Sequence, residues 1–135
     1  MQGEQESGGD PVEALEAPGR GVVLVVDDDP DICESVADLL VGVGFHVITA
    51  GDGAQALSII ERDGRPDAML LDLMMPGMSG WDFLAYRSRS EALLGIPVIV
   101  TSAADFTMGP DVVAFLPKPF DPEKLILALR ALMPR

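Results

Sequence analysis

Short apolar runs alternate with amphipathic stretches along residues 22–132, and this alternation limits the folds that the chain can adopt. Val22–Val26 is apolar throughout, which is typical of a strand buried on both faces. Asp29 and Pro30 then form a helix N-cap and first-turn pair, and apolar residues recur after them at helical spacing. Similar segments follow, so the sequence predicts strands at Val22–Val26, His46–Thr49, Ala68–Leu71, Pro97–Val100 and Val112–Leu116, and helices that begin at Pro30, after Asp52, near Trp81 and at Pro122.

Strands that alternate with helices indicate βα units. Right-handed crossovers between such units give a parallel sheet with helices on both faces. We therefore expect an α/β, flavodoxin-like doubly wound fold with five strands in the order 2-1-3-4-5. In sheets of this kind, a functional site forms at the carboxyl ends of the strands.

The composition fits one domain and argues against some functions. The chain has 135 residues, and we expect a flexible acidic tail over residues 1–19 and one folded domain over residues 20–135. It has no long apolar run and no signal-peptide pattern, so we expect a cytoplasmic protein without a membrane partner. The formal net charge of −13 repels DNA and RNA, so we also expect no nucleic-acid partner.

Polar residues follow four of the five predicted strands. Each one alone has an ordinary explanation as a helix cap, a strand former or a solvated turn residue, and Asp29 is expected to be only a cap. Together they should meet at one edge of the sheet, because the carboxyl ends of parallel strands lie side by side. In strand order, these residues are Asp27 and Asp28, Asp72, Thr101 and Ser102, and Lys118.

These residue types suit phosphoryl transfer to a carboxylate. Clustered carboxylates repel one another unless a cation lies among them, and Mg²⁺ prefers such hard oxygen ligands. A lysine is a compact positive charge for a phosphate group, and a hydroxyl can donate a hydrogen bond to a phosphate oxygen. The sequence therefore predicts Mg²⁺ as a cofactor and an aspartyl phosphate as the product.

Four segments resemble the receiver domain of bacterial two-component response regulators, of the single-domain, chemotaxis-regulator type. They read VLVVDDD, LLDLMMPGMSG, PVIVTSA and FLPKPF, and the resemblance spans essentially residues 21–135. It implies a phosphorylatable switch that accepts a phosphoryl group from a histidine kinase and then changes its binding to a partner. It also implies a signalling domain that is not an enzyme beyond catalysing its own phosphorylation and dephosphorylation.

The resemblance implies roles for the residues at the strand ends. Asp72 would accept the phosphoryl group, with Thr101 and Lys118 as the other catalytic residues, and the Lys118–Pro119 bond would be cis. The remaining roles are metal binding, by Asp27, Asp28, Asp72 and the backbone carbonyl of Met74, and switching, by Thr101, Ser102 and Phe115.

The resemblance also implies partners, and one segment departs from the family. The partners would be a sensor histidine kinase or histidine phosphotransfer protein and an unidentified protein target. Between Thr101 and Lys118 the chain is shorter than the family pattern by roughly five residues, more than one helical turn, and Gly109 and Pro110 interrupt it. We therefore expect helix 4 to be shortened or irregular, and the protein to be a monomer or weak dimer that does not dimerise through that helix.

The sequence ends soon after the last predicted helix. We expect either a stand-alone receiver or part of a longer protein, with an output that depends on a protein contact.

Two other functions share some of these residues. A haloacid-dehalogenase-like phosphatase also uses an aspartate nucleophile, Mg²⁺ and a lysine, but Asp31 stands where that family has a hydroxyl or apolar residue. A pseudo-receiver, a protein-interaction module that is not phosphorylated, normally lacks an acidic residue or the lysine, and both are present here. Turnover of a phosphate ester would favour the first alternative, and absence of Asp72-dependent phosphorylation would favour the second.

Overall fold

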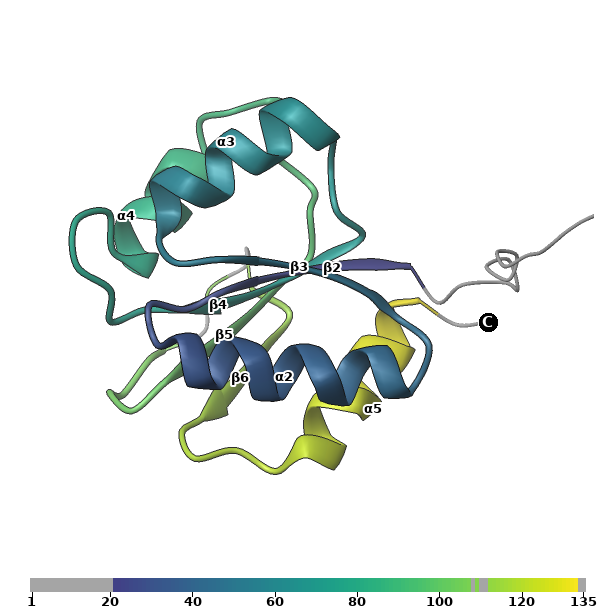
Figure 1. The fold of residues 1–135 in the computed structure, drawn as a ribbon. Helices are drawn as coiled ribbons and strands as arrows, with labels where there is room; N and C mark the ends of the chain where they lie inside the picture. The colour runs from purple at the N-terminus through teal and green to yellow at the C-terminus, as the bar shows by residue number, and fades with distance from the viewer. Residues whose placement is uncertain (1–20, 108, 110–111, 134–135) are drawn as a thin grey trace, which may run out of the picture.

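The computed structural model describes residues 21–107, 109 and 112–133, and a parallel five-stranded sheet forms its centre (Figure 1). The order of its strands is β3-β2-β4-β5-β6, which is 2-1-3-4-5 when counted along the chain from β2. This confirms the predicted doubly wound topology. The strands are β2 (Val22–Val26), β3 (His46–Ala50), β4 (Ala68–Asp72), β5 (Val98–Ser102) and β6 (Ala114–Pro117).

Helices cover both faces of the sheet, as the crossover rule requires. In Figure 1, α3 and α4 lie on one face and α2 and α5 on the other. Each face therefore has its own apolar core, one around Phe83 and Met69 and the other around Leu40 and Leu125. The helices are α2 (Pro30–Gly42), α3 (Gly53–Asp63), α4 (Gly80–Arg87) and α5 (Pro122–Leu132).

Side-chain caps begin every one of these four helices. The carboxylate of Asp29 accepts a hydrogen bond from the Asp31 amide, so Asp29 is the helix cap that its sequence context predicts. Ser79 and Asp82 form a reciprocal capping box at the start of α4. These caps fix where the loops after β2 and β4 end, and both loops border the edge that the polar residues share.

Burial separates the central strands from the edges. All residues of β4 and β5 are buried, whereas β3 and β6 each expose part of their length. The predicted strand order 2-1-3-4-5 puts the strand at His46–Thr49 at an edge, and β3 is an edge strand. None of the helices in the described part of the chain is long and apolar enough to cross a membrane.

Several predicted boundaries differ from the structure by one to three residues. The fourth strand begins at Val98 and continues to Ser102, because its pairing with β4 extends through Asp72 and Thr101. The fifth strand begins at Ala114 and not at Val112. The helix predicted to begin near Trp81 begins at Gly80 and ends at Arg87. Apolar periodicity marks the core of an element, but hydrogen bonding sets its ends.

The connection from β5 to β6 contains no helix among its described residues, which are 103–107, 109, 112 and 113. The expectation of an irregular helix 4 is therefore confirmed for this part of the chain. Phe106 packs its ring against Phe115, with centroids 5.6 Å apart and planes tilted by 49°. Both rings lie against the core that α3 and α4 cover. The predicted flexible tail, residues 1–19, lies outside the described residues, so the proposed division of the chain stays a prediction.

Candidate phosphoryl-transfer site

Three carboxylates meet at the carboxyl edge of the sheet. Asp27 follows β2 directly, Asp28 comes next, and Asp72 is the last residue of β4. Because β2 and β4 pair in parallel with Val26 opposite Leu71, their ends are level. Each aspartate offers an oxygen within 4.8 Å of the others. Asp27 and Asp72 are buried and Asp28 is exposed, so the cluster is open to solvent on one side.

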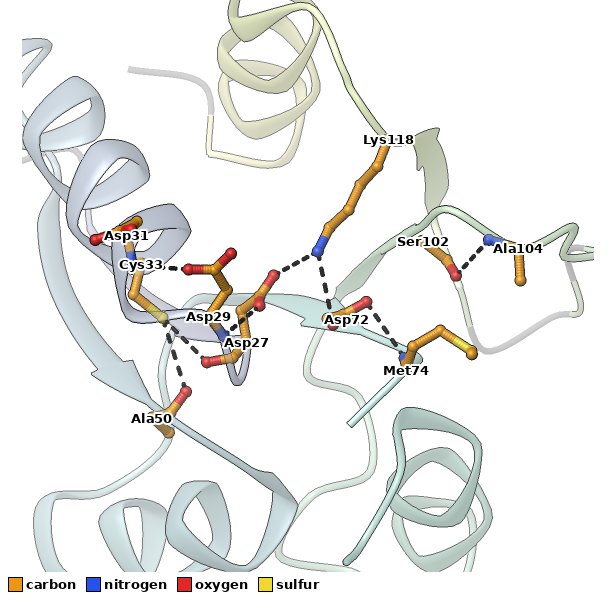
Figure 2. Close-up of polar contacts among 10 residues, drawn as sticks. All are labelled: Asp27, Asp29, Asp31, Cys33, Ala50, Asp72, Met74, Ser102, Ala104 and Lys118. Carbon is orange, nitrogen blue, oxygen red and sulfur yellow. Dashed lines mark hydrogen bonds and ion pairs between the residues drawn. The ribbon is translucent and has the colours of Figure 1, made fainter. Parts of the chain in front are cut away.

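Lys118 brings a positive charge to this cluster from the loop after β6. Its Nζ donates to Asp27 Oδ2 at 2.7 Å and lies 3.6 Å from Asp72 Oδ2, as Figure 2 shows. Lys118 therefore forms ion pairs with both aspartates, and the shorter contact is with Asp27. The Lys118–Pro119 bond is cis, as the resemblance implies.

The pKa shifts follow from burial and charge. Burial, followed by repulsion from Asp27, raises the pKa of the Asp72 carboxyl. Burial alone would lower the pKa of Lys118. Its hydrogen bond to Asp27 and the charges of Asp27 and Asp72 outweigh burial, so the pKa of Lys118 is raised. Lys118 therefore stays protonated at neutral pH, and the carboxylates keep more negative charge than one ammonium group neutralises.

The residue types fit a divalent cation. Three carboxylate oxygens in one small cluster are hard donors, which Mg²⁺ prefers, and the exposed side leaves room for the waters that Mg²⁺ retains. The cation would also offset the repulsion from Asp27, which adds to burial in raising the pKa of Asp72. The prediction that Asp27, Asp28 and Asp72 lie together is borne out by this geometry.

Three other predicted residues lie close to Asp72. Thr101 is buried and pairs with Asp72 in the β4–β5 register. The Met74 amide donates to Asp72 Oδ1 at 3.3 Å, while its side chain is 55% exposed. Ser102 is also buried, but its Oγ accepts a hydrogen bond from the Ala104 amide at 3.0 Å, so its hydroxyl orients the next loop (Figure 2).

Phe115 lies one strand further along the sheet, opposite Val100 and half-buried. Its contact with Phe106 was not predicted. A large apolar residue in a segment without apolar periodicity is the one sequence signal that could have indicated it. Cys33 was also missed as a neighbour of the site: its Sγ lies 3.2 Å from the Asp27 carbonyl oxygen. Burial and the charge of Asp27 raise the pKa of the Cys33 thiol, so it stays protonated.

Gly80 is required where α4 approaches the end of β4. A Cβ there would lie 2.5 Å from the Asp72 carbonyl oxygen and 2.6 Å from Leu73 Cα. Because backbone atoms cannot move aside cheaply, we expect Gly80→Ala to lower the free energy of unfolding by about 1–3 kcal/mol. Gly42→Ala is the matched control, since a Cβ at Gly42 meets nothing within 4 Å. Urea denaturation measures both, and equal stability of the two variants would contradict the close approach.

Comparison with known protein families agrees with this geometry. The sequence model of the response regulator receiver domain family matches residues 23–130 of the chain. The chain belongs to this family. This family membership places the chain in two-component signalling. It argues against the alternative of a haloacid-dehalogenase-like phosphatase.

Curated relatives and solved structures give the same assignment. The probable transcriptional regulatory protein TcrX of Mycobacterium tuberculosis is 42% identical in an alignment of length 128 that covers 88% of this chain and 53% of TcrX. The DNA-binding response regulator MtrA of Mycolicibacterium smegmatis is 40% identical in an alignment of length 122 that covers 86% of this chain and 52% of MtrA. A CheY-like receiver domain protein from Methanospirillum hungatei superimposes with a TM-score of 0.74 at 34% identity, over 84% of this chain and 94% of that one.

These relatives correct one prediction. Net charge led us to expect no nucleic-acid partner, but MtrA is described as DNA-binding and TcrX as a transcriptional regulatory protein. The chain spans about half the length of these curated relatives. The prediction is wrong because the charge of a receiver domain describes only its own surface, not what a response regulator binds through other residues.

Proposed function

We propose that Asp72 is the phosphoryl acceptor of this receiver domain and that Asp27 and Asp28 hold Mg²⁺ beside it. The observation that carries this proposal is the cluster of three carboxylates within 4.8 Å of one another, with Lys118 Nζ between Asp27 and Asp72. Such a cluster is costly without a cation, so its presence at a sheet edge indicates a functional site. The Met74 carbonyl is proposed as a further metal ligand.

The proposed reaction is an in-line transfer. An oxygen of Asp72 forms a bond to phosphorus while the bond from phosphorus to the imidazole nitrogen of the donor's phosphohistidine breaks, and the donor histidine keeps the electron pair. Lys118 and the Thr101 hydroxyl stabilise the equatorial phosphoryl oxygens, where negative charge gathers. Mg²⁺, when bound, would neutralise charge on the carboxylates and the phosphoryl group. We infer that catalysis is limited to this protein's own phosphorylation and dephosphorylation.

Acetyl phosphate tests the proposal without a kinase. We expect the protein to take up one phosphoryl group per chain with Mg²⁺ and none with EDTA, as measured by intact-protein mass spectrometry. No uptake would favour the pseudo-receiver alternative. Continuous release of phosphate from an ester such as p-nitrophenyl phosphate would indicate a phosphatase instead.

We predict that the phosphoryl group, once attached, is long-lived. Met74 and Ala103, two residues beyond Asp72 and Thr101, have no carboxylate or amide to orient an attacking water molecule. The exposed Met74 side chain also places apolar surface beside the site. We expect a half-life of many minutes or longer for the purified phosphorylated protein, and a half-life of seconds would contradict this reasoning.

We infer from the relatives that the signal accepted at Asp72 is passed on to DNA. Thr101, Ser102 and Phe115 are proposed as the residues that change on phosphorylation. Phe106 joins this set because its ring contacts that of Phe115. The cytoplasmic location and the absence of a helix 4 dimer stay predictions.

A further inference from the structure

The backbone N–H, the backbone carbonyl and the carboxylate of Asp27 each make a polar contact. Its N–H donates to the Ala50 carbonyl at 3.0 Å. Its carboxylate accepts from the Asp29 amide at 2.9 Å and from Lys118 Nζ at 2.7 Å. Its carbonyl oxygen lies 3.2 Å from the thiol sulfur of Cys33. Each hydrogen-bonding group of Asp27 thus has a partner, and the one for the carbonyl is a side chain.

Cys33 reaches this carbonyl from the first turns of α2. The side chain is buried, at 8% exposure, and points at the ends of β2 and β3, as Figure 2 shows. Its sulfur is also 4.0 Å from the Ala50 carbonyl oxygen, at the limit for a hydrogen bond to sulfur. The thiol thus connects helix α2 to the backbone at the carboxyl ends of β2 and β3.

The carbonyl of Asp27 and the N–H of Asp28 belong to one planar peptide unit. The orientation of that plane therefore influences the direction in which the Asp28 side chain points relative to the Asp27 side chain. Asp28 is exposed, so neighbouring side chains enclose its carboxylate little. A donor that fixes the peptide plane consequently also fixes how the two carboxylates face each other.

We propose that Cys33 is a positioning residue for the cation site: its thiol donates to the Asp27 carbonyl and so holds the Asp27 and Asp28 carboxylates toward a common ion. This inference rests on the proposed function, because it assumes that these carboxylates bind Mg²⁺. Cys33 does not bind the ion itself, because it acts through the backbone of Asp27.

Calorimetric titration of the whole chain with Mg²⁺ tests the inference without a phosphorylation step. Cys33→Val keeps a side chain of similar volume but has no donor, and we expect it to weaken Mg²⁺ binding roughly 3–10-fold, as for loss of one hydrogen bond. Cys33→Ala should do the same. Cys33→Ser keeps a donor that can reach the same carbonyl, so its affinity should stay within about twofold of the wild type.

Val36→Ala is the control for a general effect of loosening α2. Val36 is buried one turn further along the same helix, in the same apolar core. We expect it to lower the melting temperature but to leave the Mg²⁺ affinity unchanged. Wild-type affinity in Cys33→Val, equal weakening in Cys33→Ser, or equal weakening in Val36→Ala would overturn the inference. A wild-type chain that binds no Mg²⁺ would instead contradict the proposed function.

Discussion

Asp72→Asn is expected to abolish phosphorylation by acetyl phosphate and, at the same time, to raise the melting temperature of the Mg²⁺-free protein. The first effect follows because an amide cannot take the place of the attacking carboxylate oxygen. The second follows because Asp72 is buried beside Asp27, with only one lysine to offset the two charges. Removal of this repulsion should raise the free energy of unfolding by about 1 kcal/mol, and the melting temperature of a domain of this size by about 4 °C.

The pH dependence of this stabilisation has a definite sign. The pKa of Asp72 is raised in the folded protein, so its carboxyl favours the folded state only where it is protonated. That contribution is complete below the carboxyl's usual pKa and is lost as the pH rises through the higher folded value. Asp72→Asn should therefore melt above the wild type at neutral pH, and the difference should disappear in acid.

Asp38→Asn is a matched control for the loss of one negative charge. Asp38 is exposed on α2, away from the cluster. We expect it to be phosphorylated like the wild type and to melt at nearly the same temperature at every pH. Differential scanning calorimetry over a pH series and mass spectrometry give both readouts. A destabilised Asp72→Asn at neutral pH would show that the cluster is not under charge repulsion.

Lys118→Met is expected to have the second-largest effect, on both rate and stability. Without Lys118, Asp27 and Asp72 lose the cation that stands 2.7 Å and 3.6 Å from their oxygens. The transferred phosphoryl group loses an electrostatic partner, and removal of one such partner costs roughly 100-fold in rate. We therefore expect phosphorylation by acetyl phosphate to slow by about two orders of magnitude.

The same substitution should destabilise the Mg²⁺-free fold. The side chain of Lys118 is 19% exposed, so its ion pair is largely shielded from solvent, and breaking it should cost about 2–3 kcal/mol. Because the pKa of Lys118 is raised in the folded state, its contribution is complete below its usual pKa and is lost only in strongly alkaline solution. The loss should thus be seen across the neutral range, and saturating Mg²⁺ should reduce it.

Lys124→Met separates this effect from a change in net charge. Lys124 is exposed on the first turn of α5 and carries the same charge as Lys118. It should be phosphorylated at the wild-type rate and unfold at the wild-type urea concentration. If Lys118→Met behaved like this control, the lysine would have no part in the site.

The sequence was sufficient to predict the topology and the meeting of three carboxylates at the carboxyl edge of the sheet. Buried parallel strands appear as unbroken apolar runs, so the positions just after Val26 and Leu71 could be recognised as strand ends. The topology of a doubly wound sheet then brings such ends together. This is why the sequence predicts that Asp27, Asp28 and Asp72 meet.

Details that depend on side-chain packing could not be predicted. No pattern shows that Lys118 lies nearer to Asp27 than to Asp72, because that depends on the path of the loop after β6. The thiol of Cys33 reaches the Asp27 carbonyl only because the first turns of α2 pack against β2 and β3. Phe106 lies in a segment without periodicity, where the sequence gives no indication of which residues turn inward.

Reductive trapping of the phosphorylated protein shows which residue carries the phosphoryl group. Sodium borohydride cleaves an aspartyl phosphate and converts that residue to homoserine, which peptide mass spectrometry can locate. After treatment with acetyl phosphate and Mg²⁺, we predict that this conversion occurs at Asp72 and at no other carboxylate. Conversion at Asp27 or Asp28, or no conversion in a protein that has bound Mg²⁺, would contradict the proposal that Asp72 is the phosphoryl acceptor.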